Sequence, residues 1–278
     1  MTAWHPGLYV TATPIGNLDD LAPRAAAAFR MAALVAAEDT RVTGRLVRAA
    51  GSTARLVSLT EHNVEARIPE VLAAAVEGVV VLATDAGTPG ISDPGARLVA
   101  AAHEAGIRLA AIPGPSALAA AVSVAGFDAA VTVFAGFLPR RSGERRRRLL
   151  DLAGSNRMLV CFEAPGRVPE LLTDVADVLD DPLVVVCREL TKLHEEIVRD
   201  RASALVDRFA HARGEFTIVI GPTGDFAAGG RDAKDLLAAF RRAGAQRSAA
   251  ASEVSKLTGA DRGELYRWWD ESAEGGES

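Results

Sequence analysis

Short apolar runs alternate with helix-like segments through the first half of the chain, and this rhythm restricts the fold more than any other feature. The clearest run, 79–83 (VVVLA), is apolar at every position, which is typical of a strand buried on both faces. Runs at 8–12, 34–37, 56–59 and 108–112 are likewise followed by a loop and then a helix-like segment. This order predicts a mostly parallel sheet with helices on both faces.

The second half of the chain also contains strand-like and helix-like segments. Strands are expected at 132–137, 158–162, 183–187 and 216–220, and helices at 143–152, 168–179 and near 204–212. A glycine-rich hinge at 227–231 precedes a small helical tail. We therefore expect an N-terminal α/β domain at 1–126, a second α/β domain at 127–225 and a helical tail at 226–278.

Charge and cysteine usage narrow the class of protein. The 278 residues carry a net charge of −5, which argues against an indiscriminate nucleic-acid binder. Cys161 and Cys187 sit inside apolar runs and are expected to be buried, reduced thiols. The start of the chain lacks a signal-peptide pattern, and no stretch approaches 18 uninterrupted apolar residues. A cytoplasmic protein that does not enter a membrane is therefore expected.

The basic residues are almost all arginine. Only Lys192, Lys234 and Lys256 are lysines among the 31 basic residues. A coding preference for arginine accounts for most of this bias. The scarcity nevertheless draws attention to each lysine, because burial lowers the pKa of a lysine readily and that of an arginine hardly at all.

Loops rich in Gly, Pro, Asp, Ser and Thr follow the strands of the first half. They are Thr11–Asn17, Ala37–Arg41, Thr84–Gly95 and Pro113–Ser116. In open α/β sheets, ligands bind beyond the carboxyl ends of the strands, where these loops meet. Glu38 or Asp39 stands where dinucleotide-binding folds place a ribose-binding carboxylate, but the first loop lacks G-x-G-x-x-G and no P-loop is present. A ligand without phosphate, such as S-adenosylmethionine, needs neither motif, and Asp85 could hold its amino or sulfonium end.

Several motifs occur together in one order: TPIGNL, AEDTR, TDAGTPGISDPG, IPGPSA, FAGFLPRR, FEAPGR and CRELTKLHEE. From about residue 8 to 269, the chain resembles the tetrapyrrole-methylase superfamily of S-adenosylmethionine-dependent methyltransferases. Within it, the motifs are similar to those of the small-subunit ribosomal RNA ribose 2′-O-methyltransferase I family, which acts on a cytidine of the decoding centre. The resemblance implies two α/β domains of the class III methyltransferase type, a homodimer and a small C-terminal helical tail.

The resemblance also implies a cofactor site. The residues that match its cofactor segments are Pro14, Ala86, Gly87, Thr88, Ile91, Ser116, Ala117 and Glu163. The first loop departs from the G-x-G-P-G pattern of true tetrapyrrole methylases, which favours RNA over a corrin or sirohaem precursor as substrate.

Candidates for catalysis lie in the RELTK and AEDTR motifs. A ribose hydroxyl is a poor nucleophile, so a nearby base or cation would help its attack on the methyl group. Lys192 is the first candidate, with Glu189 and Arg188 placed to orient it or an RNA phosphate; the alternative is a lysine that only pairs with Glu189. Asp39 and Arg41 are expected to shape the substrate pocket, unless they form a purely structural salt bridge. His62 is a second candidate, and the histidines and cysteines show no metal-ligand spacing.

Segment 139–150 (PRRSGERRRRLL) is the strongest candidate for RNA binding. It holds six arginines against one glutamate: Arg140, Arg141, Arg145, Arg146, Arg147 and Arg148. The run 145–148 spans a full helical turn, so its charges cannot all be buried, and phosphate contact is expected for the segment. Segments 248–258 and 262–269 have a helix-turn-helix spacing. Trp268 and Trp269 either stack on bases or dock a small helical bundle on the main body or a partner subunit.

The pattern as a whole predicts an S-adenosylmethionine-dependent methyltransferase that modifies the ribose of a cytidine in 16S ribosomal RNA, free or within the small ribosomal subunit. One alternative is a tetrapyrrole-precursor methylase. Another is a non-catalytic nucleic-acid-binding protein built on the tail, which would leave the loop motifs unexplained.

Overall fold

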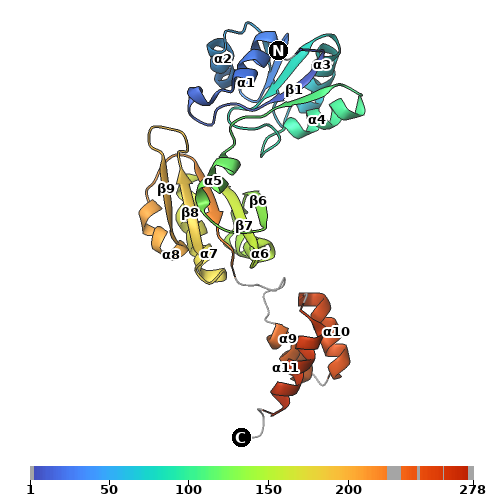
Figure 1. Cartoon of the computed structure of the whole chain (residues 1–278), viewed down its shortest axis with the longest axis vertical. Helices are drawn as coiled ribbons and strands as arrows, with labels where there is room; N and C mark the ends of the chain where they lie inside the picture. Colours follow the sequence, from blue (N-terminus) through green and yellow to red (C-terminus); the bar gives the residue numbers. More distant parts are fainter. Residues whose placement is uncertain (1–2, 224–232, 243–244, 259, 275–278) are drawn as a thin grey trace. The chain divides into compact units, whose positions relative to one another are not determined.

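The computed structural model describes residues 3–223, 233–242, 245–258 and 260–274 (Figure 1). The expected hinge at 227–231 lies outside these residues. The chain divides into two compact units, Met1–Val124 with Arg188–Glu196, and Ala125–Cys187 with Ile197–Ser278. Residues Arg188–Glu196 thus belong to the first unit, although the residues on either side of them in the sequence belong to the second. The division of the chain at 126 and 225 stays a prediction.

The first unit is built on a sheet with the strand order β3-β2-β4-β1-β5. Its strands are β1 (Gly7–Thr11), β2 (Leu34–Ala37), β3 (Arg55–Ser58), β4 (Val79–Ala83) and β5 (Leu109–Ile112). Neighbouring strands pair in parallel, with Leu8 of β1 opposite both Val80 of β4 and Leu109 of β5. The expected parallel sheet is confirmed, and the carboxyl ends of its strands lie at one edge.

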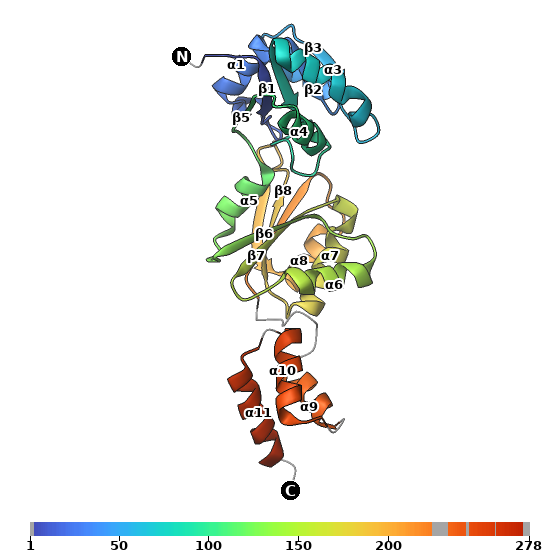
Figure 2. The same ribbon diagram turned by 90° about the vertical axis from the view of Figure 1, so that its right-hand side faces the viewer.

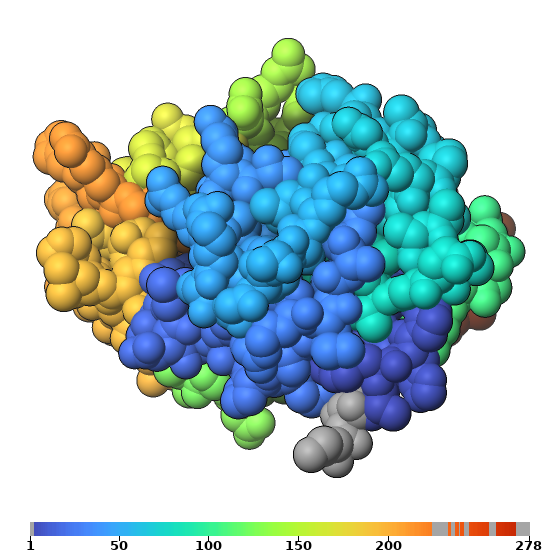
Figure 3. Space-filling model, turned by 90° about the horizontal axis from the view of Figure 1, so that it is seen from above, coloured from blue at the N-terminus to red at the C-terminus, as the bar shows by residue number. Residues whose placement is uncertain are grey.

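Helices cover both faces of this sheet, because its central strands are apolar on both sides (Figures 1 and 2). They are α1 (Pro23–Met31), α2 (Thr40–Ala49), α3 (Val64–Glu77) and α4 (Gly95–Glu104), whereas α5 (Ala117–Ala125) follows β5 in the chain. Successive residues of a strand point to opposite faces, so Tyr9 packs with Phe29 of α1 while Leu8 packs with Leu98 of α4. Blue and cyan atoms of this unit form a continuous surface in the end-on view of Figure 3. Helix α3 begins at Val64 and contains Pro69.

The second unit holds a mixed sheet with the strand order β6-β7-β10-β8-β9. Its strands are β6 (Val131–Phe137), β7 (Arg157–Glu163), β8 (Leu183–Arg188), β9 (Glu196–Arg201) and β10 (Phe216–Ile220). Strand β9 was not expected from the sequence, because EIVRDR lacks an apolar run. It lies at the edge of the sheet, where charged side chains are common. The thiols of Cys161 and Cys187 are buried, and burial raises the pKa of Cys161 to about 12.

Helices α6 (Ser142–Leu152) and α7 (Val168–Val178) pack on a core formed with this sheet, which includes Leu149, Leu171 and Ile218. The helix expected near 204–212 is shorter, since α8 (Ala202–Leu205) is followed by the 3-10 turn η3 (Asp207–Phe209). Other 3-10 turns are η1 (Leu18–Asp20) and η2 (Pro165–Arg167).

The tail forms helices α9 (Ala233–Arg242), α10 (Arg247–Thr258) and α11 (Arg262–Glu274) around a small core. Trp268 and Trp269 are partly buried against this core. Lys234 Nζ lies 4.6 Å from the ring centroid of Trp268, and the Arg241 guanidinium carbon lies 5.5 Å from that of Trp269. The tryptophans thus pack on the core of the tail itself, and both stacking on bases and docking on another surface stay predictions.

Core packing of the first unit generates a stability prediction. Leu8 is fully buried in a central strand, so Leu8→Ala should lower the free energy of unfolding by about 2–5 kcal/mol. Val76 on α3 is 59% exposed, and Val76→Ala should change it by no more than about 0.5 kcal/mol. Urea denaturation followed by circular dichroism measures both. Equal effects of the two substitutions would contradict the assigned core.

Candidate functional site

Two of the expected ligand-binding loops are joined by backbone hydrogen bonds at the carboxyl edge of the first sheet. The N–H of Thr13 donates to the carbonyl of Gly87 at 2.9 Å, and the N–H of Gly87 donates back to Thr13 at 3.1 Å. The fully buried Thr13 hydroxyl donates to the Thr84 carbonyl at 3.2 Å. Gly87 has a φ of +80°, a conformation that L side chains rarely adopt. The loop after β1 and the loop after β4 therefore act as one body.

The loop after β5 is tied to the same body. The Thr88 hydroxyl donates to the carbonyl of Pro115 at 3.0 Å. A Cβ on Gly114 would lie 3.1 Å from the Cβ of Ala12, so this close approach favours glycine. These bonds join the loops that carry the expected cofactor residues of the first unit, namely Pro14, Ala86, Gly87, Thr88, Ile91, Ser116 and Ala117. We call this joined set, residues 11–17, 84–95 and 113–117, the loop rim.

Several carboxylates lie in the loop rim and next to it. The Asp85 side chain accepts a hydrogen bond from the N–H of Asp39 at 2.9 Å. Burial raises the pKa of Glu38, and the negative charges of Asp85, Asp93, Glu61 and Asp39 raise it further. Burial also raises the pKa of Asp85, although the hydrogen bond from Asp39 opposes this. The negative potential at this edge suits a cationic ligand.

Asp39 and Arg41 form the ion pair that was one interpretation of the AEDTR motif. The Asp39 carboxylate caps α2 by accepting from the N–H of Arg41 at 2.8 Å, and it also pairs with the Arg41 guanidinium at 2.6 Å. Hydrogen bonds from Arg41 hold the pKa of Asp39 at about 2. The Arg41 side chain is 88% exposed, so most of the guanidinium surface stays open to a binding partner despite the ion pair.

The RELTK motif forms a loop of the first unit, although strands β8 and β9 of the second sheet flank it. Lys192 Nζ lies 2.9 Å from Glu189 Oε1, so the ion pair that was the alternative to a catalytic lysine is present. Arg188 pairs with Glu196 at 3.3 Å. These side chains are about one-fifth to one-quarter exposed, which leaves room for a ligand at the loop. His62 is exposed in the turn before α3.

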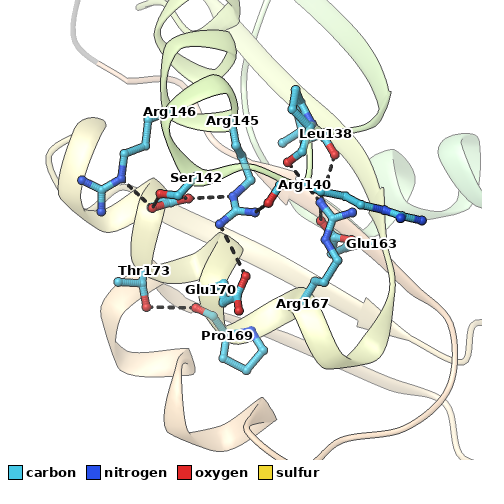
Figure 4. A network of polar contacts seen from close by, with 12 residues as sticks. Leu138, Arg140, Ser142, Arg145, Arg146, Glu163, Arg167, Pro169, Glu170 and Thr173 are labelled. Carbon is cyan, nitrogen blue, oxygen red and sulfur yellow. Dashed lines mark hydrogen bonds and ion pairs between the residues drawn. The ribbon is translucent and has the colours of Figure 1, made fainter.

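Glu163 lies in the second unit, at the end of β7, and is 3% exposed. Its Oε2 is 3.1 Å from Arg167 Nη2, and its Oε1 accepts from the N–H of Ala164 at 2.8 Å (Figure 4). Burial raises the pKa of Glu163, and the Ala164 N–H and Arg167 counter this effect. The Arg167 guanidinium also donates to the carbonyls of Leu138 and Pro139, which links Glu163 to the start of the arginine-rich segment.

The arginine-rich segment contains one residue that the structure removes from the expected RNA surface. Arg145 is 1% exposed, and its Nε donates to Asp174 Oδ2 at 2.6 Å (Figure 4). Arg146 donates to Asp174 Oδ1 at 2.6 Å and pairs with Asp177. The expectation that Arg145 contacts RNA is therefore wrong, because a buried guanidinium satisfied by a carboxylate holds α6 on α7 instead.

Other arginines of the segment face solvent. Arg140, Arg141, Arg147 and Arg148 are exposed, and Arg141 forms an ion pair with Glu144 at 3.3 Å. The sequence patterns did not indicate the roles of Asp174 and Arg167. An aspartate on the apolar face of α7, between Leu171 and Val175, was the signal that could have indicated a buried partner.

Comparison with known proteins shows the family of this chain. The family model described as Tetrapyrrole (Corrin/Porphyrin) Methylases matches residues 7–206. The chain is 40% identical over 268 residues to the ribosomal RNA small subunit methyltransferase I of Xylella fastidiosa, covering 94% of this chain and 98% of that protein. This chain belongs to the tetrapyrrole methylase family. Within the family it groups with proteins named ribosomal RNA small subunit methyltransferase I. The relative of this name from Mesorhizobium japonicum is 41% identical, and the match covers 95% of this chain and 91% of the relative.

Two solved structures share the fold. Cobalt precorrin-4 methyltransferase superposes with a TM-score of 0.60 at 18% identity, covering 77% of this chain and 94% of its own. Diphthine synthase superposes with a TM-score of 0.59 at 16% identity, covering 77% and 89%. The expected fold of two α/β domains is confirmed.

Metal clusters and membrane-spanning helices are both absent from the described part of the chain. Within residues 3–223 and the described tail, no group of three or more His, Cys, Asp or Glu side chains is arranged to hold a metal ion. Among the helices of the same residues, none has both the length and the apolar character needed to cross a bilayer.

The buried network between α6 and α7 generates a pH-dependent prediction. Burial alone would raise the pKa of Asp174, but hydrogen bonds from Arg146, Ser142 and Arg145 leave it lowered. Asp174→Asn keeps the shape and removes the charge that balances Arg145, so it should lower the free energy of unfolding by about 3–5 kcal/mol at pH 7. The stabilisation is fully present above the unfolded pKa of about 4, and it is lost as the pH falls through the lower folded pKa.

Denaturation of wild-type and Asp174→Asn proteins at several pH values measures this difference, which should shrink as the solution is acidified below about pH 4. Asp177→Asn is the matched control, because Asp177 pairs with the same Arg146 but is half exposed. A similar loss in both variants, or one independent of pH, would show that the buried charge pair is not what holds α6 on α7.

Proposed function

We propose that this chain is an S-adenosylmethionine-dependent methyltransferase that methylates the ribose 2′-hydroxyl of a cytidine in the decoding region of 16S ribosomal RNA. The observation that carries this proposal is the 40% identity to ribosomal RNA small subunit methyltransferase I over nearly the full length of both chains. The TPIGNL, EDTR, DAGTP and RELTK motifs supply the cytidine and 2′-oxygen detail through the family resemblance. A cytoplasmic location and a homodimer are part of the same proposal.

The loop rim fits the proposed cofactor. Its threonine hydroxyls are directed to loop carbonyls, and its glycines allow the backbone to come close to a ligand. The carboxylates beside it favour a cationic sulfonium over a phosphate. When bound, S-adenosylmethionine supplies a methyl group on a positively charged sulfur. The residues proposed to hold it are Pro14, Asp85, Ala86, Gly87, Thr88, Ile91, Ser116, Ala117 and Glu163.

Lys192 and Glu189 are proposed to serve the attacking oxygen. Lys192, paired with the Glu189 carboxylate, acts as a cation beside the 2′-oxygen and stabilises the negative charge that develops on it. Glu189 orients the ammonium through the 2.9 Å ion pair. Asp39, fixed as the cap of α2, shapes the substrate pocket together with Arg41.

Exposed arginines are proposed to contact the RNA backbone. Arg41, Arg140, Arg141, Arg147 and Arg148 present their side chains to solvent, where phosphate oxygens can reach them. Arg146 and Arg188 are partly exposed and engaged with carboxylates, so their phosphate contacts would add to existing ion pairs. These local charges answer the objection that the net charge of −5 raises against nucleic-acid binding.

Two measurements test the function itself. Titration calorimetry with S-adenosylmethionine should show binding, and its absence would contradict any methyltransferase activity. Mapping of ribose methylation on small-subunit RNA, with and without the protein, should then show one cytidine gained. Assays on naked RNA and on assembled subunits, side by side, identify the substrate. Methylation of a tetrapyrrole precursor without any RNA product would favour the alternative enzyme.

Removal of the Lys192 ammonium should slow methyl transfer without loss of the cofactor. Lys192→Ala should lower kcat by about 100-fold or more, because it removes a group that stabilises the reacting oxygen. Lys192→Arg retains the charge and should keep more turnover than Lys192→Ala. Single-turnover methylation and calorimetry separate chemistry from cofactor binding. Leu193→Ala, at a 93% exposed neighbour in the same loop, is the control, and an unchanged rate in Lys192→Ala would end the catalytic assignment.

Neutralising the exposed arginines of α6 should reduce the salt dependence of RNA binding. Each phosphate interaction that Arg147→Ala or Arg148→Ala removes should lower the slope of log affinity against log salt by about 1. Arg24→Ala and Arg97→Ala remove exposed charges from helices α1 and α4 of the first unit and serve as controls. Filter binding over a range of salt concentrations measures the slopes. The same change of slope in both pairs would indicate general electrostatics rather than a binding surface on α6.

A further inference from the structure

The side chain of Lys192 lies across the backbone of Gly16 in the loop after β1. A Cβ built on Gly16 would collide with Lys192 Cγ, and it would stand only 2.9 Å from Cε and 3.1 Å from Cδ. Carbon atoms without a bond between them prefer about 3.5–4 Å, so any side chain at residue 16 would overlap the lysine stem. The missing side chain of Gly16 therefore leaves a notch that is filled by Cγ, Cδ and Cε of Lys192.

The two loops that meet at this notch are each held in place. Glu189 and Thr191 adopt φ values of +51° and +68°, and the N–H of Lys192 donates to the Glu189 carbonyl at 3.0 Å. On the other side, Ile15 is buried, and the Asn17 side chain accepts from the N–H of Asp19 at 3.0 Å. Each backbone is thus held by local hydrogen bonds, and the flexible lysine stem is the part expected to move away from an added side chain.

We propose that Gly16 is a positioning residue for Lys192. The notch restricts the rotamers of the lysine stem, and the ion pair with Glu189 holds the ammonium at its end, so that the charged group stands at one place on the loop rim. An alanine at residue 16 displaces the stem and separates the ammonium from Glu189. The effect on methyl transfer rests on the proposed function of Lys192, whereas the notch itself does not.

The scarcity of lysine provides a test that does not depend on activity. Acylation by N-hydroxysuccinimide acetate, followed by peptide mass spectrometry, reports the reactivity of Lys192 with Lys234 as internal reference. An ammonium held by the Glu189 carboxylate and a stem packed on Gly16 are less accessible to the reagent, so Gly16→Ala should raise the relative rate at Lys192 by roughly threefold or more. Gly78→Ala is the matched control, since its Cβ would meet Ala33 Cβ at an ordinary 3.8 Å. An unchanged rate at Lys192 in folded Gly16→Ala would overturn the proposal.

A double-mutant cycle connects the notch with turnover. Gly16→Ala should lower kcat in the wild-type background and have no further effect in the Lys192→Ala background, because the two changes remove the same contribution. An equal loss in both backgrounds would mean that Gly16 acts on something other than Lys192. Full turnover in Lys192→Ala alone would overturn the catalytic role and leave the acylation result to decide the notch.

Folding of the variants supplies a second measurement should Gly16→Ala prove unstable. Removal of the lysine stem empties the space that the new methyl group needs. Gly16→Ala/Lys192→Ala should therefore unfold at the same temperature as Lys192→Ala, while Gly16→Ala alone unfolds lower. If the double variant is as unstable as Gly16→Ala, the clash is not with Lys192 and the proposal is wrong.

Discussion

The reciprocal backbone hydrogen bonds between Thr13 and Gly87 are the interaction on which the candidate site depends. Loops that leave neighbouring parallel strands share an edge of the sheet, but nothing in that arrangement alone makes them rigid. Three sets of contacts join these loops into one rim. They are the Thr13–Gly87 backbone pair, the hydrogen bond of the buried Thr13 hydroxyl and the bond from Thr88 to Pro115. Polar groups that would otherwise be buried without partners are satisfied by one another, so the rim is ordered before any ligand arrives.

A rim built this way explains why the site is made of backbone and small residues. Close approach of Gly114 to Ala12 and the positive φ of Gly87 exclude larger side chains at those positions. Negative charge is supplied by Asp85 within the rim and by Glu38 and Asp39 after β2. This division suits a ligand that is large, mostly uncharged and cationic at one point. It does not suit a pyrophosphate, which would meet carboxylates where it needs donors.

Sequence patterns predicted the first sheet almost completely, because parallel strands buried on both faces are apolar throughout and the loops between them carry distinct residues. Strand β9 escaped because an exposed edge strand needs no apolar run. Arg145 was misjudged because burial of a charge depends on its partner, and Asp174 lies 29 positions away on another helix. Membership of the RELTK loop in the first unit follows from tertiary packing, which local sequence pattern does not contain.

Lys192 shows how local pattern and tertiary contact combine. Its rarity among arginines drew attention to it, yet that rarity alone fits a plain ion pair with Glu189 equally well, and the ion pair exists. The notch at Gly16 changes the balance. A surface salt bridge contributes little stability and does not require a glycine in a distant loop to accommodate its stem. Gly16 has no side chain and belongs to a rim suited to a cationic ligand. The need to place the Lys192 ammonium accurately explains this glycine better than the stability of the ion pair does.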